Sequence, residues 1–599
     1  MQYIIVESIS AFNYAKKKFR KVDICWASSS PKVCNFFFIN KFNYIEIEKL
    51  VIQKELDEIE KISKNICEAI ISESNNIFIK KKYLDLRYIA GAAILKKIYS
   101  IIYKNYLLNK ILSKTKKNLI CVGNSDLTNN FNYLGIETFD NIFTVLGNCF
   151  KKKIKIIEYK ENTNIIKKNT LTNINDNFFF KKIISFLNSN YSVFLFKILK
   201  HLSSNNFFKN FLNKKNKKQL LIMNETDHIS FSFNKILKKY DIIFFNENFR
   251  DIENKINKNK NKSLNNKFYK SYININYKII KYLKNSSLKK NQIINYEKGL
   301  MLVLTQIYQY LQSLDENSYL IENKFKKIIS QFKKDFCIIS NNTNKFMSSI
   351  FVSYCQNMGI KSFFFEHGLR GHSISDKTFS DYYAQYKADY GIYYWKKSTQ
   401  YLYPCPNQKK IIDGFPFDAR NNFFKFFFKK ILIKINFKIS IFQKTIVFLS
   451  DLERNNDNYP KCTNDYKIVK NNKEIIKFLA KEYPKKIIVL KLYPTQKYLD
   501  IYDYQDLAKE FNNVRVIRDI SFDYIADIFD EIYISSPSST LLRCMSSKAK
   551  VYFLKTSNDN YIKTFIKKKI KVNINNVKSC YLLNKNLNKI SYNWISFLG

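Results

Sequence analysis

Residues 363–372, FFFEHGLRGH, contain two of the four histidines and two of the eleven glycines in this chain. The imidazole of His367 titrates near neutrality and can accept a proton from a hydroxyl nucleophile. The carboxylate of Glu366 beside it can orient the ring or raise its basicity, and Gly368 would let the backbone approach a ligand closely. The segment therefore predicts a general base with an assisting carboxylate, although a histidine with a purely structural role in a turn remains an alternative.

Metal binding is not what this spacing predicts. His372 lies five residues beyond His367, which does not place the two rings on one face of a helix, and no further ligands complete a set. The eleven cysteines are scattered, with no C-x-x-C pair, so we expect reduced thiols in a cytoplasmic protein. We therefore expect no metal and no bound cofactor.

A second polar segment, SSPSST at residues 535–540, is rich in hydroxyl groups and precedes an apolar helical pattern. A turn that opens a helix offers free backbone N–H groups, hydroxyl donors and the positive end of the helix dipole to a phosphate. Ser supplies an ordinary helix cap equally well, so both interpretations stay open. The candidate phosphate-binding residues are Ser536, Ser538, Ser539 and Thr540.

Several cations stand near these positions in the predicted sheet. Lys491 is a candidate point charge and Arg454 a candidate fork for a diphosphate, although each could equally be a solvated loop charge. The chain has only nine arginines among 101 basic residues, so Arg515, Arg518 and Arg543 are also of interest.

These residues follow apolar runs that read as strands. The run at 361–366 comes after a helical stretch and an earlier strand at 335–340, so this β-α-β unit places His367 at the carboxyl end of a strand. Strands also alternate with helices from residue 444 onward, which predicts a parallel, doubly wound sheet. Ligands of such sheets bind beyond the carboxyl ends of the strands.

The organisation along the chain predicts an α/β protein of two Rossmann-like, doubly wound domains that face a cleft. Residues 1–418 form the first domain, with a Lys/Asn-rich surface insertion or flexible excursion near 251–297. Residues 419–443 form a linker, and 444–599 the second domain.

The net charge of +51 does not by itself indicate nucleic acid, because the excess is almost all Lys spread along the whole chain. It favours anionic partners, including phosphorylated donors and anionic lipids. The Phe- and Lys-rich segment 421–442 is a candidate for membrane contact, but strict alternation over 433–441 predicts a half-buried strand or linker equally well. No stretch of about 18 residues lacks charge, so we expect a cytoplasmic protein with at most peripheral membrane contact.

The ordered series EHG, ADYGIYYW (388–395), DGFPFD (413–418), IVFLSD, VLKLYP and ISSPSSTLLRCMSSKAKVYFL resembles bacterial surface-polysaccharide transferases of the GT-B fold. It is similar both to capsule and lipopolysaccharide glycosyltransferases and to CDP-glycerol:polyol phosphotransferases. The resemblance covers residues 335 to about 555. It implies that the N-terminal domain binds a glycan or lipid-linked acceptor and the C-terminal domain a nucleotide-activated donor.

The resemblance implies a metal-independent, inverting sugar transfer in which His367 is the base and residues 535–540 bind the donor phosphate. Tyr493 stands where relatives often have a second histidine, which weakens the phosphotransferase alternative. Arg370, Gly368, Tyr493 and Arg518 are further candidates for donor or acceptor contacts. The remaining alternatives are an epimerase acting on UDP-N-acetylglucosamine, a basic nucleic-acid-binding protein and a catalytically inactive partner in carbohydrate assembly; no specific nucleic acid is expected.

Overall fold

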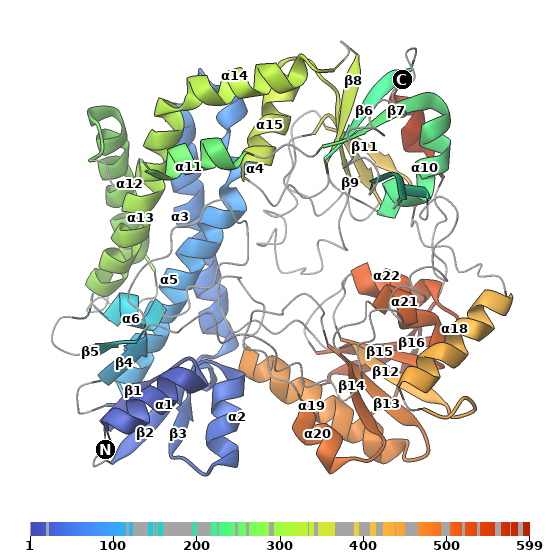
Figure 1. Cartoon of the computed structure of the whole chain (residues 1–599). Helices are drawn as coiled ribbons and strands as arrows, with labels where there is room; N and C mark the ends of the chain where they lie inside the picture. Colours follow the sequence, from blue (N-terminus) through green and yellow to red (C-terminus); the bar gives the residue numbers. More distant parts are fainter. Residues whose placement is uncertain are drawn as a thin grey trace.

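The computed structural model describes residues 2–598 with internal gaps. The gaps are 20–22, 79, 116–118, 124–141, 148–149, 151–153, 160–194, 197, 201–216, 224–226, 246–248, 259–262, 287–292, 333–334, 341–345, 366–387, 395–407, 415–422, 438, 450–464, 493–503, 518–521, 536–538, 557–564, 576 and 585–590. The described residues form three separate sheets and a column of long helices (Figure 1). The α/β class and the parallel, helix-flanked sheets that the sequence predicts are confirmed.

The first sheet is wholly parallel, with strand order β3-β2-β1-β4-β5. The chain passes from β1 outward to β2 and β3 and then returns to place β4 on the other side of β1, so the sheet is doubly wound. Its strands are short apolar runs, as expected where helices cover both faces. The elements are β1 Gln2–Ile5, α1 Ile9–Lys18, β2 Ile24–Ser28, α2 Pro31–Ile39, β3 Tyr44–Glu46, η1 Ile47–Leu50, β4 Leu119–Gly123, α6 Ile142–Gly147 and β5 Ile154–Glu158.

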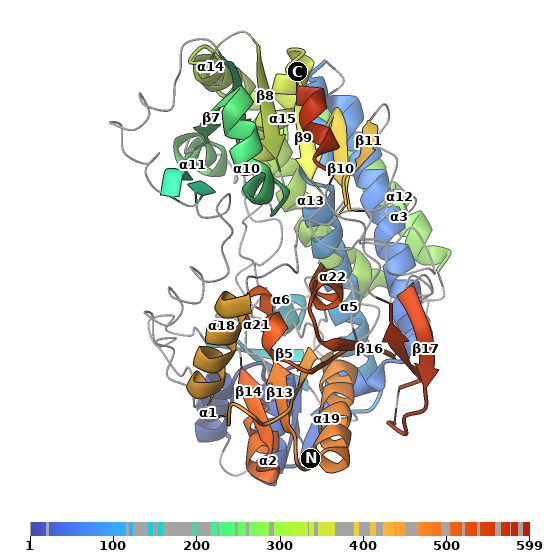
Figure 2. The same ribbon diagram turned by 90° about the vertical axis from the view of Figure 1, so that its right-hand side faces the viewer.

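Long helices form a column that runs from the first sheet to the middle sheet (Figures 1 and 2). Within it α3 packs against α5 and α12, and α13 packs against α5 and α12. Their inward faces share one apolar core with the first and middle sheets. The elements are α3 Gln53–Ile77, η2 Lys82–Leu84, α4 Leu86–Ile89, α5 Gly91–Leu112, α11 Arg250–Lys258, α12 Asn266–Lys284, α13 Ile293–Glu316 and α14 Ser318–Ile329.

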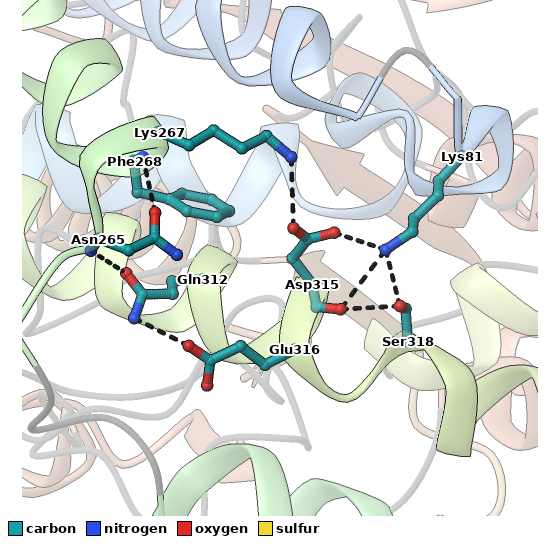
Figure 3. A network of polar contacts seen from close by, with 8 residues as sticks. All are labelled: Lys81, Asn265, Lys267, Phe268, Gln312, Asp315, Glu316 and Ser318. Atoms are coloured by element: carbon teal, nitrogen blue, oxygen red, sulfur yellow. Dashed lines mark hydrogen bonds and ion pairs between the residues drawn. The ribbon is translucent and has the colours of Figure 1, made fainter.

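The expected excursion at 251–297 is instead mostly helical and packed. The side chain of Asn265 caps α12 by accepting from the backbone N–H of Phe268 at 3.2 Å. Gln312 accepts from the backbone N–H of Asn265 at 2.8 Å, and Asp315 lies 3.3 Å from the ammonium of Lys267 (Figure 3). One face of α12 is buried at Phe268, Ser271, Ile275, Ile279 and Leu283. This spacing of three and four residues is that of an amphipathic helix.

The middle sheet is also parallel, with order β11-β10-β9-β8-β6-β7. The chain runs from β6 to β7 on one side and then from β8 through β11 on the other, so this sheet is doubly wound as well. Gly359 follows the helix before β9 with a φ of 77°, the left-handed conformation in which glycine commonly terminates a helix. The elements are β6 Lys218–Ile222, α10 Asp227–Lys239, β7 Tyr240–Phe244, β8 Phe336–Ser340, α15 Phe346–Asn357, β9 Ser362–Phe365, β10 Tyr390–Tyr393 and β11 Lys409–Ile412.

The last residues of the chain pack on this middle sheet, although the sequence assigned all of 444–599 to one domain. Trp594, in η7 Asn593–Leu598, is fully buried. Its ring packs edge-on against that of Phe365, with the two ring centroids 4.9 Å apart. Asp413, just after β11, accepts from the hydroxyl of Ser591 at 2.8 Å and from the backbone N–H of Asn593 at 3.0 Å. The chain therefore returns from the third sheet to the middle one.

The third sheet has order β14-β13-β12-β15-β16-β18-β17. The five strands from β14 to β16 are parallel, as predicted, and an antiparallel pair that the sequence did not reveal extends one edge. The elements are β12 Thr445–Leu449, α19 Asp465–Glu482, β13 Ile487–Lys491, α20 Gln505–Glu510, β14 Val514–Ile517, α21 Phe522–Ile525, η5 Ala526–Ile528, β15 Glu531–Ile534, α22 Ser539–Ser546, β16 Lys550–Lys555, β17 Ile566–Ile570 and β18 Ser579–Leu583.

For the segment 421–442 the sequence left membrane contact, a half-buried strand at 433–441 and a linker open. The structure has the helix α18 Phe423–Asn436, which includes the first four residues of the alternating stretch. Ile433 and Phe437 are four residues apart and both enter the core of the third sheet. The ammonium of Lys434 is buried and donates to the carbonyls of Ile441 at 2.8 Å and Gln443 at 2.6 Å. This buried lysine ties the end of α18 to the chain that enters β12.

Residues 1–418 thus contain two sheets where the sequence predicted one Rossmann-like domain. The first sheet also contacts the third, because α19 packs beside α2 and η1. Burial at this contact raises the pKa of Glu46, and Lys49, Tyr44, Lys473 and Lys470 partly oppose the shift. Figures 1 and 2 both place the middle and third sheets one above the other.

Candidate functional site

The third sheet has a single point at which its parallel strands reverse their order. From β12 the chain goes to β13 and β14 on one side, and it then crosses to β15 and β16 on the other. Ligands of doubly wound parallel sheets bind at the carboxyl edge, beside the point where the strand order reverses. The candidate site is therefore this edge of the third sheet.

Lys491 lies at this edge as the last residue of β13. It pairs with Leu449 of β12 on one side and with Ile517 of β14 on the other. Its side chain is only 4% exposed, and its ammonium donates to the carbonyl of Leu492, the next residue. A buried ammonium is costly unless anionic or polar groups meet it. This position thus supplies a desolvated positive charge beside the switch point.

Ser535 is the first residue after β15 and lies on the other side of the switch point. Its side chain is 6% exposed, and its hydroxyl has no hydrogen-bond partner in the part of the chain that the structure describes. Leu449 of β12 pairs with Lys491 of β13 on one side and with Ile534 of β15 on the other. Ser535 directly follows Ile534, so Lys491 and Ser535 lie two strand spacings, or roughly 10 Å, apart. The edge therefore combines a buried cation with a buried hydroxyl donor.

The helix α22 begins four residues after Ser535, at Ser539, and Thr540 lies partly exposed in its first turn. An ion pair anchors α22: the guanidinium of Arg543, within this helix, lies 2.8 Å from the carboxylate of Asp527. Both side chains are more than nine-tenths buried, and Arg543 also donates to the hydroxyl of Ser546 at 3.0 Å. Arg543 thus holds the helix, whereas the sequence considered it as a cation of interest at the site.

Arg515 also has a local role. It is the second residue of β14, and its guanidinium donates to the carbonyls of Asn512 at 2.7 Å and Val514 at 3.0 Å. These carbonyls precede or begin the strand, so Arg515 stands toward the amino end of β14, away from the carboxyl edge. It does not join Lys491.

The other half of the predicted site follows β9 in the middle sheet. Phe363, Phe364 and Phe365 are buried in this strand, between β8 and β10. The strand ends one residue before Glu366, so the described backbone leads directly into the predicted base and carboxylate.

Most predicted site residues lie outside the described residues. The predicted site residues whose side chains the structure describes are Lys491 and Thr540, and Ser535 is a further buried residue at the same carboxyl edge. Ser535 belongs to the predicted Ser-rich segment, but its burial could not be read from a run of similar residues. For Ser539 the backbone alone is described. The predicted site residues outside the described part are Glu366, His367, Gly368, Arg370, Arg454, Tyr493, Arg518, Ser536 and Ser538.

Within the described ranges, no group of three or more His, Cys, Asp and Glu side chains is placed to hold a metal ion. Eight of the eleven cysteines are described, and all eight are buried free thiols. Among the described helices, none combines the length and the apolar character that spanning a bilayer requires. Compared with known proteins, the chain matches no family model and no curated sequence.

Proposed function

We propose that this protein is a GT-B-type glycosyltransferase that moves a sugar from a nucleotide-activated donor to a growing surface glycan. The observation that carries the proposal is the strand-order reversal of the third sheet, where the buried ammonium of Lys491 and the buried hydroxyl of Ser535 lie at the carboxyl edge on either side of β12. A desolvated cation and hydroxyl donors suit a phosphorylated ligand, because charge-assisted hydrogen bonds are strong in a dry site.

In this proposal the third sheet binds the donor and the middle sheet the acceptor. Both sheets are doubly wound, and the two lie one above the other (Figure 2). The first sheet and the helical column are then additions to the usual pair of domains. The acceptor would be a capsule- or lipopolysaccharide-type glycan or a lipid-linked sugar, so the enzyme would work at a membrane surface without spanning it.

The proposed chemistry is a direct displacement at the anomeric carbon. The acceptor hydroxyl loses its proton to His367, which Glu366 orients, and its oxygen forms the new glycosidic bond. The bond from the anomeric carbon to the donor phosphate breaks, and the nucleotide leaves with that electron pair. Positive charge and hydroxyl donors stabilise the departing phosphate, so the proposal requires no metal. The residues proposed to hold the phosphate are Lys491, Thr540, Ser536, Ser538, Ser539 and Arg454.

A donor screen with product analysis tests this function. Wild-type protein is incubated with UDP-, GDP-, CMP- and CDP-activated sugars and, separately, with CDP-glycerol, and the released nucleotide and the new product are identified by mass spectrometry. Sugar transfer supports the proposal. Release of CMP from CDP-glycerol would instead assign a polyol phosphotransferase, and an isomerised donor without transfer would assign an epimerase.

The base assignment is tested by His367→Ala against His372→Ala as the matched control. Loss of a general base lowers turnover by roughly 100- to 10,000-fold. The His372 variant should keep turnover close to wild type, since that histidine has no proposed role. Near wild-type turnover by the His367 variant would contradict the assignment.

A further inference from the structure

The outer face of α12 exposes more large apolar side chains than a surface helix needs. Tyr269, Ile273 and Tyr277 are 53%, 46% and 73% exposed, and each lies one helical turn from the next. At 100° per residue these three side chains occupy a sector of about 80°, so they form a continuous line along a helix about 28 Å long. Figure 1 places α12 at the outer edge of the helical column, away from the middle and third sheets.

Basic residues lie on the same outer face: at 100° per residue Lys284 falls within this sector, and Lys270 and Lys281 lie about 20° and 40° beyond its edge. Lys270, Lys281 and Lys284 are exposed, and in the part of the chain that the structure describes they have no ion-pair partner. The whole sequence of α12, NKFYKSYININYKIIKYLK, contains no Asp or Glu.

Neighbouring carboxylates are already engaged on the flank of the helix. Glu73 lies 3.0 Å from the ammonium of Lys278, and Asp315 lies 3.3 Å from that of Lys267. These contacts join α12 to α3 and α13, as Figure 3 shows for Asp315. The outer face is therefore positively charged, and it is presented by a helix that is fixed on its other side.

We propose that this face of α12 binds the surface of an anionic lipid bilayer. Tyr side chains have an apolar ring and a polar tip, and they are enriched at membrane–water interfaces. A helix with an apolar line beside lysines lies in the interface plane and is attracted to anionic lipids. Ile273, at the centre of the line, would enter the acyl boundary but offers no ring on which a base could stack.

Two other occupants fit this face less well. A second copy of the chain would bring lysines of one face against lysines of the other, which is unfavourable. A nucleic acid would be expected to meet arginine as well as lysine, and α12 contains no arginine.

The structure separates this face from the exposed apolar side chains around α18, the segment that the sequence made a candidate for membrane contact. Around α18, Phe427, Ile435 and Phe442 are 50%, 60% and 95% exposed. Figures 1 and 2 both show α12 and α18 on opposite sides of the molecule, so a flat bilayer would contact one or the other. Among the described side chains, α12 has an unbroken apolar line beside three exposed lysines, whereas in α18 Lys434 is buried and Lys430 lies 3.9 Å from Asp530, so we favour α12. This inference rests on the proposed function in one respect: a lipid-linked acceptor would explain why the protein binds a membrane.

The test is flotation of the full-length protein with vesicles of phosphatidylcholine, alone or with roughly one-third phosphatidylglycerol. Wild type should float with the anionic vesicles and much less with the neutral ones. Replacing Lys270, Lys281 and Lys284 together by Gln should lower the partition coefficient roughly 100-fold, because each lysine near an anionic surface contributes roughly five-fold. Tyr269→Ser with Tyr277→Ser should also release the protein.

The matched control replaces Lys567, Lys568 and Lys569 by Gln. These lysines are exposed on β17, and the variant changes the net charge equally. The partition coefficient of this variant should stay within about two- to three-fold of the wild-type value, because the net charge of the whole protein contributes less to binding than lysines at the bilayer surface do. An equal loss in the two lysine variants would overturn the proposal, as would loss of flotation on Phe427→Ser with Phe442→Ser alone.

Two further measurements distinguish this inference from the transferase proposal. Turnover on a water-soluble acceptor should be unchanged in the α12 variants. Vesicle binding without sugar transfer would support this inference and contradict the transferase proposal, and sugar transfer without vesicle binding would do the opposite. A random-sequence oligonucleotide should leave vesicle binding of wild type intact. Displacement of the vesicles by the oligonucleotide, abolished in the α12 lysine variant, would assign the face to nucleic acid and contradict the proposal.

Discussion

Replacing Asp527 by Asn would leave the guanidinium of Arg543 buried without its carboxylate. The two side chains are 5% and 8% exposed, and 2.8 Å separates the nearest nitrogen and oxygen. Removing one partner of a pair buried to this extent costs about 3–5 kcal/mol. Arg543 keeps its hydrogen bond to the hydroxyl of Ser546, so the lower end of that range is expected. The loss should fall on α22, which this pair holds at the candidate site.

Native-state hydrogen exchange of the amides of α22 measures this effect locally, which is necessary because a chain with three sheets need not unfold in one step. A cost of about 3 kcal/mol accelerates exchange roughly 100-fold. Replacing both partners by Leu should restore much of the protection, because an apolar pair leaves no buried charge. Donor binding, where present, should weaken in Asp527→Asn as α22 loosens.

An exposed pair in the same domain is the matched control. Lys477 and Glu510 also lie 2.8 Å apart, but their side chains are 42% and 46% exposed. Glu510→Gln should change local stability by less than about 1 kcal/mol. If Asp527→Asn accelerated exchange in α22 no more than Glu510→Gln does in its own helix, the assignment of Arg543 as the residue that fixes α22 would be refuted.

Three further predictions follow from buried groups elsewhere. Burial raises the pKa of Glu46, so the folded state binds the carboxyl proton more tightly than the unfolded chain does. The protonated carboxyl therefore contributes its full stabilisation at pH values below the pKa of the unfolded chain. That contribution is lost as the pH rises through the pKa of the folded state. The Tm of Glu46→Gln minus that of wild type should therefore increase between about pH 4 and about pH 8, and a flat difference would contradict this. Burial raises the pKa of Cys25 to about 11 and of Cys580 to about 12, so iodoacetamide at neutral pH should label both only after denaturation, as peptide mass spectrometry would show; rapid labelling of the native protein would oppose it. Trp594→Ala should destabilise the middle sheet by about 3–5 kcal/mol, since the ring is fully buried against Phe365; unchanged exchange in β9 would refute that packing role.

Local patterns in the sequence predicted the strands well. The strands of the third sheet are continuous apolar runs, such as TIVFL and IIVLK, and helices of ordinary length separate them. Such runs can be recognised without tertiary information because both faces of a parallel sheet are buried. The same reasoning located Lys491 at a carboxyl edge, because a residue at the end of an apolar run stands at the end of the strand.

Composition obscured two helices. In α12, Phe268, Ile275 and Ile279 follow helical spacing, but abundant Lys and Asn made the region resemble a flexible excursion. In α18, apolar residues on alternate positions also include pairs four residues apart, so Ile433 and Phe437 satisfy both periods. Lys434 donates to the backbone carbonyls of Ile441 and Gln443, and no local sequence pattern predicts these hydrogen bonds.

The number of sheets and the path of the C-terminus depend on contacts between residues far apart in sequence. Nothing near Trp594 indicates that it packs on Phe365, more than two hundred residues earlier. The unpaired hydroxyl of Ser535 is equally a property of the folded environment, since the sequence shows only one serine among several.

Binding of nucleotide donors to matched lysine variants tests the central claim most directly. Lys491→Met removes the buried cation at the carboxyl edge of the third sheet, and Lys434→Met removes one that lies near the start of β12, at the amino edge. Isothermal titration of wild type with UDP, GDP, CMP, CDP and their sugar derivatives should identify one bound class. Affinity for it should fall roughly 10- to 100-fold in Lys491→Met, the range for a lost charge-assisted hydrogen bond, and stay near wild type in Lys434→Met. Absence of binding across the series, or equal affinity in both variants, would contradict a donor site at this edge.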